Sequence, residues 1–209
     1  MSKEYHFEVK RKRPEETYEK VSDYFKGERL NKYAESKSMM HIQEKITIRA
    51  LEILELEKES IILDMGCGPG FTSIYLKEIG HHVVALDLIS EFLKYYELHE
   101  INPLAADMCF TPFKPASFDA IISISALQWI LRDINDNLMK NRMINLAKSI
   151  SFILKPNSKA IFQFYPKTDS IMKEIGKIFA ENTALNGNFV IDNPNNPTKR
   201  DIFLFLAKK

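Results

Sequence analysis

A glycine-rich segment preceded by an acid is the first candidate for chemistry in this sequence. "LDMGCGPG" runs from Leu63 to Gly70 and has glycines at positions 66, 68 and 70. Glycines let the backbone approach a bound ligand closely. A dinucleotide-binding fingerprint would need glycine at position 71, where Phe71 stands. The carboxylate of Asp64 would repel a pyrophosphate, so the segment favours a cationic ligand.

A second acid, Asp87, closes the next apolar run along the chain. An acid at the end of such a strand can accept hydrogen bonds from both hydroxyls of a ribose. Alone, it is as often a helix cap. The neighbouring glycine segment favours the ribose role for Asp87.

The segment "SISALQWI", Ser123 to Ile130, holds the single tryptophan, Trp129, and has no Asp, Glu, His, Lys or Cys. Together with "QFYP", Gln163 to Pro166, it follows a predicted strand. Ligands of parallel sheets bind beyond the carboxyl ends of the strands. Trp129 and Tyr165 are therefore candidates for stacking on an aromatic substrate, and ordinary packing is the alternative for each.

Composition limits the classes of protein that fit. The chain has 209 residues, 45% of them hydrophobic, and a net charge of +1, so any contact with RNA would need a local patch. The basic run from Lys10 to Pro14 is such a patch, a nuclear-import signal or a solvated tail.

Cys67 and Cys109 form no C-x-x-C pair, and no metal-binding cluster is visible. We expect an intracellular protein with free thiols, without a signal peptide or membrane span.

The pattern of apolar residues indicates the elements that position these groups. Helical periodicity over 39–56 precedes an alternation of strands and helices. The predicted strands are 60–66, 82–87, 102–107, 118–125, 159–165, 188–192 and 201–208, and the predicted later helices are 71–80, 90–100, 137–155 and 170–185, the last ended by Asn186-Gly187.

This alternation predicts an α/β fold with a doubly wound, mostly parallel seven-stranded sheet. A tight turn before the final strand makes that strand antiparallel. We expect a polar N-terminal segment over 1–37 and one domain over 38–209.

"LDMGCGPG" resembles the first motif of class I S-adenosylmethionine (AdoMet) methyltransferases. The resemblance implies that Gly66, Cys67, Gly68 and Gly70 contact the methionine part of AdoMet, and that Asp64 reaches its ammonium group directly or through water. It also implies a Rossmann-like fold. The same fold places Asp107 opposite the adenine amino group. Asp87 is predicted to contact the cofactor through the ribose. Further cofactor contacts are predicted for Leu88 and Met108, which follow the acids Asp87 and Asp107, and for Ser125 at the end of the fourth strand. Core packing is the alternative for Leu88 and Met108.

The lack of a titratable group in "SISALQWI" suits a ring nitrogen as methyl acceptor. Guanine N7 has an in-plane lone pair and no proton to lose. Catalysis then reduces to proximity, alignment and tolerance of positive charge. Aromatic faces stack on a base and stabilise a cationic ring. We therefore predict substrate-positioning roles for Trp129 and Tyr165, with no general base and no metal.

The whole chain is similar to the 18S ribosomal RNA guanine-N7 methyltransferases, which work with a small zinc-ribbon activator protein. The segments that carry the similarity are "NKYAESKSMMHIQEKITIRALEIL", "ISISALQW", "QFYP" and "VIDNPNNPTKRDIFL". The family usually has Ser-Arg where this sequence has Lys37-Ser38.

The resemblance implies a heterodimer in which the activator adds a strand at the edge of strand three, around Ile101–Phe110. It implies small-subunit rRNA or a pre-ribosome as substrate, and no membrane. The localisation would be nucleus and cytoplasm in a eukaryote, or cytoplasm in an archaeon. Two alternatives stay open: a small-molecule AdoMet methyltransferase, and a ribosome-assembly factor whose binding role outweighs catalysis.

Overall fold

The protein is built around one seven-stranded sheet with the strand order β3-β2-β1-β4-β5-β7-β6. The computed structural model describes residues 5–96 and 101–209. β1 to β5 run parallel, and β7 pairs antiparallel with both β5 and β6. This confirms the predicted mixed α/β sheet and its antiparallel end. The strands are β1 (Ile61–Met65), β2 (His82–Asp87), β3 (Leu104–Ala105), β4 (Phe118–Ile124), β5 (Leu154–Phe164), β6 (Asn186–Asp192) and β7 (Asp201–Ala207).

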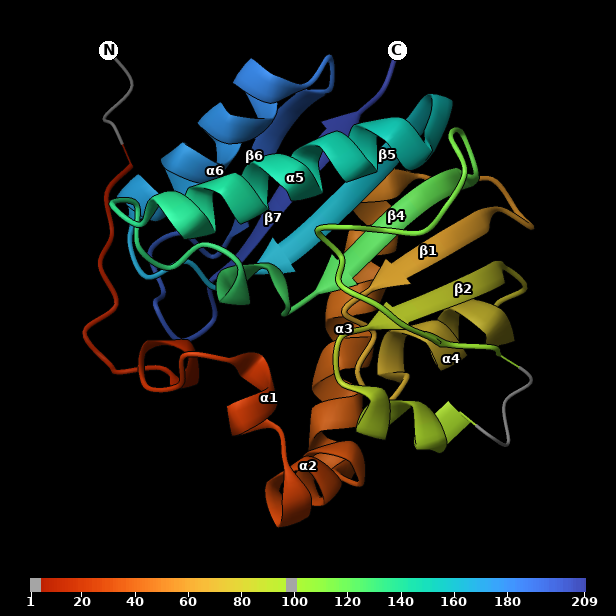
Figure 1. The fold of residues 1–209 in the computed structure, drawn as a ribbon, viewed down its shortest axis with the longest axis horizontal. Helices are drawn as coiled ribbons and strands as arrows, with labels where there is room; N and C mark the ends of the chain where they lie inside the picture. Colours follow the sequence, from red (N-terminus) through yellow and green to blue (C-terminus); the bar gives the residue numbers. More distant parts are fainter. Residues whose placement is uncertain (1–4, 97–100) are drawn as a thin grey trace.

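Helices cover both faces of the sheet (Figure 1). α5 and α6 pack on one face with a large apolar cluster, and α3 packs with α4 on the other. Short helices lie at the N-terminus and along the carboxyl edge of the sheet. The helices are η1 (Pro14–Glu16), α1 (Val21–Tyr24), α2 (Gly27–Ala34), α3 (Lys37–Leu54), α4 (Phe71–Glu78), η2 (Ser90–Tyr96), η3 (Leu127–Trp129), α5 (Asn137–Ile153) and α6 (Asp169–Asn182).

Helix α3 shows why the predicted amphipathic pattern folds as it does. Ser36 caps its first turn by accepting a hydrogen bond from the Met39 amide, and Glu55 ends it in a left-handed conformation. Its apolar side chains Ile46, Ala50 and Leu54 are buried against the sheet. No helix in the described ranges is long and apolar enough to cross a membrane.

The end of α6 differs from the prediction. The helix ends at Asn182, and Asn186-Gly187 starts β6 instead of ending the helix. Thr183 leaves the helical conformation, and its hydroxyl donates to the carbonyl of Phe179. Gly187 pairs with Leu206, and a Cβ there would lie 2.7 Å from the carbonyl oxygen of Phe205. The glycine is therefore needed for close strand pairing.

Two other elements are shorter or tighter than predicted. The helix predicted over 90–100 is a 3-10 helix over its described residues, Ser90–Tyr96, and residues 97–100 lie outside the described part of the chain. The third strand consists of Leu104 and Ala105 alone. By contrast, β5 begins at Leu154, before the predicted start.

The segment 1–37, expected to be polar and weakly patterned, contains η1, α1 and α2 within its described residues. Leu30 and Ala34 are buried against Ile89 and Phe92, with Phe25 beside them. This segment therefore contributes apolar packing at the carboxyl edge of the sheet, and we call residues 14–34 the cap.

Candidate functional site

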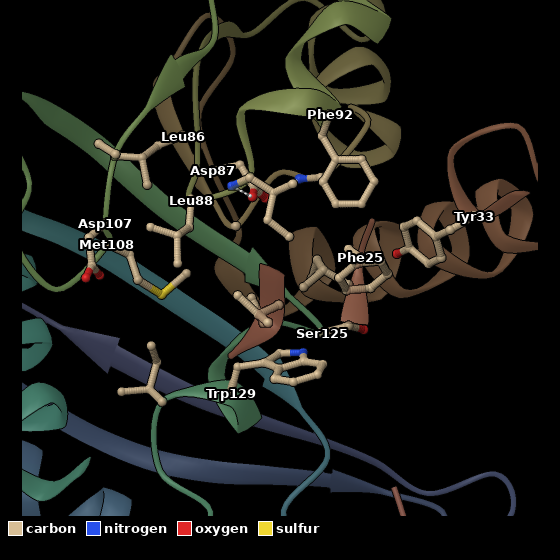
Figure 2. A pocket seen from close by; sticks show the side chains of 18 of the residues that line it. Phe25, Tyr33, Leu86, Asp87, Leu88, Phe92, Asp107, Met108, Ser125 and Trp129 are labelled. Atoms are coloured by element: carbon tan, nitrogen blue, oxygen red, sulfur yellow. Dashed lines mark hydrogen bonds between the residues drawn. The ribbon is translucent and has the colours of Figure 1, made fainter. Parts of the chain in front are cut away.

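A hollow of about 660 Å³, its open mouth included, lies at the carboxyl ends of the strands. Figure 2 shows Asp87 and Leu88 on one side, Met108 and Asp107 on another, and Trp129 and Phe25 across from them. The pocket is thus walled by β-strand ends and by the cap together. Its lining residues are Val21, Phe25, Tyr33, Gly66, Gly68, Leu86, Asp87, Leu88, Ile89, Phe92, Ala106, Asp107, Met108, Ile124, Ser125, Ala126, Trp129, Ile130 and Arg142.

The glycines of the turn between β1 and α4 have separate steric roles. All three adopt positive φ. A Cβ at Gly66 would lie 2.5 Å from the Cβ of Ala126, and one at Gly70 would lie 2.9 Å from the ring of Tyr96. Gly68 lines the pocket, and no atom lies within 4 Å of a Cβ built there. Gly66 and Gly70 therefore permit packing, whereas Gly68 leaves its side of the pocket open.

Asp87 couples this turn to the end of β2. One carboxylate oxygen accepts from the Gly68 amide at 2.7 Å, and the other accepts from the Ile89 amide at 2.8 Å. Burial raises the pKa of Asp87, and the backbone hydrogen bonds oppose that shift. Asp87 lines the pocket, and each of its oxygens can accept a further hydrogen bond, which suits ligand hydroxyls.

Asp64, Cys67 and Gly70 do not line the pocket. The carboxylate of Asp64 is buried and accepts a hydrogen bond from Ser73, which also accepts one from Tyr96. Burial raises the pKa of Asp64 to about 7. The predicted contact of Asp64 with a ligand ammonium stays a prediction, and the buried carboxylate lies behind the glycine turn.

Asp107 lines the pocket in an ion pair that the sequence did not reveal. Arg142 of α5 approaches both of its carboxylate oxygens, at 3.1 and 2.9 Å, and the Cys109 amide donates to one of them. Met108 beside it is buried, and Leu88 opposite is half exposed. Figure 2 shows the sulfur of Met108 directed into the hollow. The arrangement can receive a flat ring between Leu88 and Met108.

The end of β4 is held by a polar network. Ser125 has φ of 59°, and its hydroxyl donates to the side-chain oxygen of Gln163 at 3.0 Å. It also accepts from the buried Gln43 of α3 at 3.3 Å. The amide of Gln128 donates to the Ser125 carbonyl at 2.7 Å. Three glutamines from different elements thus fix the backbone where the pocket meets "SALQW".

Trp129 lines the pocket and also contacts the cap. Its ring lies 5.8 Å from Tyr24 and 6.3 Å from Phe25, centroid to centroid. Tyr165 is not among the lining residues. Its hydroxyl interacts with Gln163 and Ser125, and burial raises its pKa. Tyr165 therefore adjoins the pocket through Ser125, whereas Trp129 reaches it directly.

Sequence reasoning missed the aromatic part of the cap and the basic partner of Asp107. Phe25 and Tyr33 come from a segment that was expected to be polar, and Arg142 lies within an amphipathic helix. Tyr33 packs against Phe25, Phe92 and Phe71 at centroid distances of 5.0, 5.9 and 5.8 Å. The clustering of aromatic residues between positions 18 and 33 was the available signal.

Nucleophilic chemistry by cysteine does not fit the site. Both thiols are buried and reduced. Burial raises the pKa of Cys109 to about 12 and that of Cys67 well above its usual range, which disfavours a thiolate. Within residues 5–96 and 101–209, no group of three or more His, Cys, Asp or Glu is arranged to hold a metal ion.

The fold and the glycine-and-acid pocket define an AdoMet-dependent methyltransferase, and comparison with known proteins agrees. A family model described as "Methyltransferase domain" matches residues 63–162. The chain superimposes on a putative AdoMet-dependent methyltransferase from Methanococcus maripaludis with a TM-score of 0.65, at 14% identity over 87% of this chain and 92% of that one. It superimposes on the PH0226 protein from Pyrococcus horikoshii with a TM-score of 0.69, at 14% identity over 90% and 99%.

The chain belongs to the 18S rRNA guanine-N7 methyltransferase family. It is 36% identical to the 18S rRNA (guanine(1575)-N(7))-methyltransferase of Saccharomyces cerevisiae, over 82% of this chain and 64% of the relative. It is 32% identical to the 18S rRNA (guanine-N(7))-methyltransferase bud23 of Schizosaccharomyces pombe, over 88% of this chain and 70% of the relative. The chain therefore spans about two thirds of the length of these relatives.

The buried Asp64 makes stability depend on pH. Its pKa is raised from an ordinary value near 4 to about 7, so the folded protein holds this proton more strongly than the unfolded chain. The contribution of Asp64 to stability is full below pH 4 and is lost as pH rises through 7. An Asp64→Asn variant, whose amide oxygen still accepts from Ser73, should lack this decline.

The measurement is the free energy of unfolding in urea without ligand, from pH 4 to pH 8, for wild type and variant. Asp119→Asn, in a partly exposed ion pair with Lys155, is the control for removal of a carboxylate. A decline with pH that is equally steep in Asp64→Asn would show that another group titrates.

Proposed function

We propose that this protein transfers the methyl group of AdoMet to N7 of a guanine in small-subunit ribosomal RNA. The observation that supports the proposal is the position of Trp129, whose side chain lines the pocket just beyond the end of β4. The names of the relatives supply the acceptor class, since the two yeast proteins act on guanine N7 of 18S rRNA.

The pocket fits AdoMet in size and charge. It is open to solvent and is lined by apolar side chains together with a few acidic and polar ones, as is usual for small-molecule sites. AdoMet supplies an electrophilic methyl group on a sulfonium cation. Asp87 has unused lone pairs for the ribose hydroxyls, and Gly68 leaves open space beside it. Asp107, oriented by Arg142, can accept from an amino group on a ring held between Leu88 and Met108.

The acceptor side positions a base without removing a proton. Guanine N7 is nucleophilic through its in-plane lone pair, so the requirement is alignment with the methyl group. Gln163 and Gln43 hold Ser125 from two sides, which fixes the floor of the pocket at that point. Trp129 offers an aromatic face for the base and for the positive charge on the methylated ring.

Two other functions make different predictions. A small-molecule methyltransferase would methylate a free substrate and ignore RNA, and the family membership argues against it. An assembly factor would act through binding, so its role would survive the loss of AdoMet binding. The small-molecule enzyme is separated from the proposal by the absence of a methylated RNA product, and the assembly factor by a variant that cannot bind the cofactor.

The first test is methyl transfer onto precursor small-subunit particles, followed by mapping of N7-methylguanosine. Wild-type protein should produce this nucleoside at one position. Asp87→Ala should lose AdoMet binding and product, because it removes the acceptor for the ribose and the anchor of Gly68. Asp119→Ala is the matched control, because Asp119 lies near the amino end of β4 and the pocket lies at the carboxyl ends of the strands.

The absence of any guanine-N7 product with wild-type protein would refute the proposed reaction. Complementation by Asp87→Ala in a cell that lacks the endogenous enzyme would assign the essential role to assembly.

Trp129 should be required for transfer and dispensable for the cofactor. A Trp129→Ala variant removes the aromatic face at the acceptor side, and kcat for methyl transfer should fall on the order of 100-fold, as for a lost positioning group. Trp129→Phe keeps a ring and should retain more activity. Calorimetric AdoMet binding is the readout for the pocket. If both variants methylate RNA as well as wild type, Trp129 only packs the cap.

We also propose the edge of β3 as the docking site of a zinc-ribbon activator. β3 is the edge strand of the sheet, and beyond β2 its backbone has no further strand partner in the described part of the chain. Apolar side chains are exposed beside it: Phe110 is 61% exposed, Leu88 52% and Leu104 36%. An added strand would satisfy the edge and cover these side chains.

Co-expression with the zinc-ribbon protein should raise the soluble yield and protect this edge. Hydrogen exchange of the amides over 104–110 should slow in the complex. Phe110→Asp should abolish the effect, whereas Phe152→Asp, at an exposed apolar residue distant from β3, should not. A monomer whose solubility and AdoMet binding do not change with the activator would contradict this docking.

We propose nuclear and cytoplasmic localisation in a eukaryote, or cytoplasmic localisation in an archaeon, in keeping with ribosomal RNA as the substrate.

A further inference from the structure

The basic run near the N-terminus is attached to the folded domain on both sides. Before it, Glu8 forms an antiparallel bridge with Thr168, and the Val9 amide donates to the carbonyl of Lys167 at 2.9 Å. Phe7 accepts from the Asp169 amide at 3.2 Å. Figure 1 shows this segment, in red, descending past the end of the sheet near β5 and β7 to reach α1. The run is therefore held in place by main-chain hydrogen bonds.

After the run, Arg13 turns inward to the acceptor side of the pocket. Its guanidinium donates to the carbonyl of Tyr165 and lies 5.8 Å from the centroid of the Tyr165 ring. The hydroxyl of Tyr165 interacts with Ser125, which lines the pocket. A short path of contacts thus connects the basic run to the place where the methyl acceptor must enter.

Lys10, Arg11 and Lys12 lie between these anchors and are exposed. Within residues 5–96 and 101–209, none of their side chains forms a hydrogen bond or ion pair. Only the carbonyl of Arg11 is used, as an acceptor for Lys167. Lys167 itself pairs with Glu16. Three uncompensated cations therefore lie in a row on an ordered support, although the whole chain has a net charge of only +1.

We propose that Lys10, Arg11 and Lys12 form a phosphate-binding site for the RNA strand next to the target nucleotide. The inference rests on the proposed function and extends it from the base to the backbone. Cations on an ordered support position a nucleic acid without reading its sequence. The site would supply local attraction that the overall charge of the protein does not provide.

The anchored geometry favours RNA over an import receptor as the partner of this run. A receptor that reads a basic signal as an extended peptide would have to detach it from Lys167, Thr168 and Tyr165. RNA phosphates can bind the exposed side chains with these contacts intact. The run is also adjacent in sequence to Arg13, which contacts Tyr165 next to the pocket.

The test compares two triple variants that remove the same charge. The test variant carries Lys10→Gln, Arg11→Gln and Lys12→Gln. The control carries Lys58→Gln, Lys114→Gln and Lys148→Gln, three exposed residues near the amino ends of the strands. Both should bind AdoMet and melt like wild type. The measurements are KM and kcat for precursor particles, and the affinity for a small-subunit rRNA fragment by fluorescence anisotropy at several salt concentrations.

The test variant should show a KM raised on the order of tenfold with little change in kcat. Its slope of log affinity against log salt should be shallower by about 2, since each single-strand phosphate contact contributes about 0.7. The control should keep the wild-type slope and KM. Equal slopes and KM values in all three proteins would overturn the phosphate site, while product formation by wild type would leave the proposed reaction intact.

Two further outcomes separate the hypotheses. If wild type yields no N7-methylguanosine but the test variant loses RNA affinity relative to the control, the reaction is wrong and the phosphate site is supported. If the test variant binds RNA normally but fails to accumulate in the nucleus of a eukaryotic cell, the run serves an import receptor and the phosphate site is overturned.

Discussion

The close approach of two backbone segments at Gly66 is the constraint on which the site depends. The turn after β1 and the segment after β4 meet there, and a side chain at position 66 would collide with Ala126. The Gly66 amide also donates to the carbonyl of Leu86 at the end of β2. The ends of β1, β2 and β4 therefore lie close together, and residues from all three line a single pocket.

The three acids of the site show how environment separates residues of one type. Asp64 is buried behind the turn with a raised pKa, and its oxygen is bound by Ser73. Asp87 is held by backbone amides and can accept further hydrogen bonds. Asp107 is paired with Arg142. Asp87 and Asp107 line the pocket, whereas Asp64 does not.

Although its composition is polar, the N-terminal segment contains both the cap, which lines part of the pocket, and the exposed basic run. Phe25 and Tyr33 close one side of the pocket, and Arg132 donates to the carbonyls of Tyr18 and Glu19 to hold the cap near Trp129. Just before the cap, the guanidinium of Arg13 donates a hydrogen bond to the carbonyl of Tyr165. The same segment thus closes part of the pocket and carries the exposed basic run that we propose for RNA phosphates.

The sequence by itself determined the sheet, its antiparallel end and the positions of several pocket-lining groups, because the sheet follows from local periodicity and these groups lie next to strand ends. Asp87 and Trp129 were predicted from their positions after strands, and Gly66, Gly68 and Asp107 from the resemblance to AdoMet methyltransferases; all five line the pocket. Only the tertiary structure decided that Arg142 pairs with Asp107, that Gln43 reaches Ser125 and that Phe25 joins the wall. It also placed Asn186-Gly187 in a strand. These features join residues far apart in the chain, and the free energy of such contacts depends on packing that local sequence patterns do not encode.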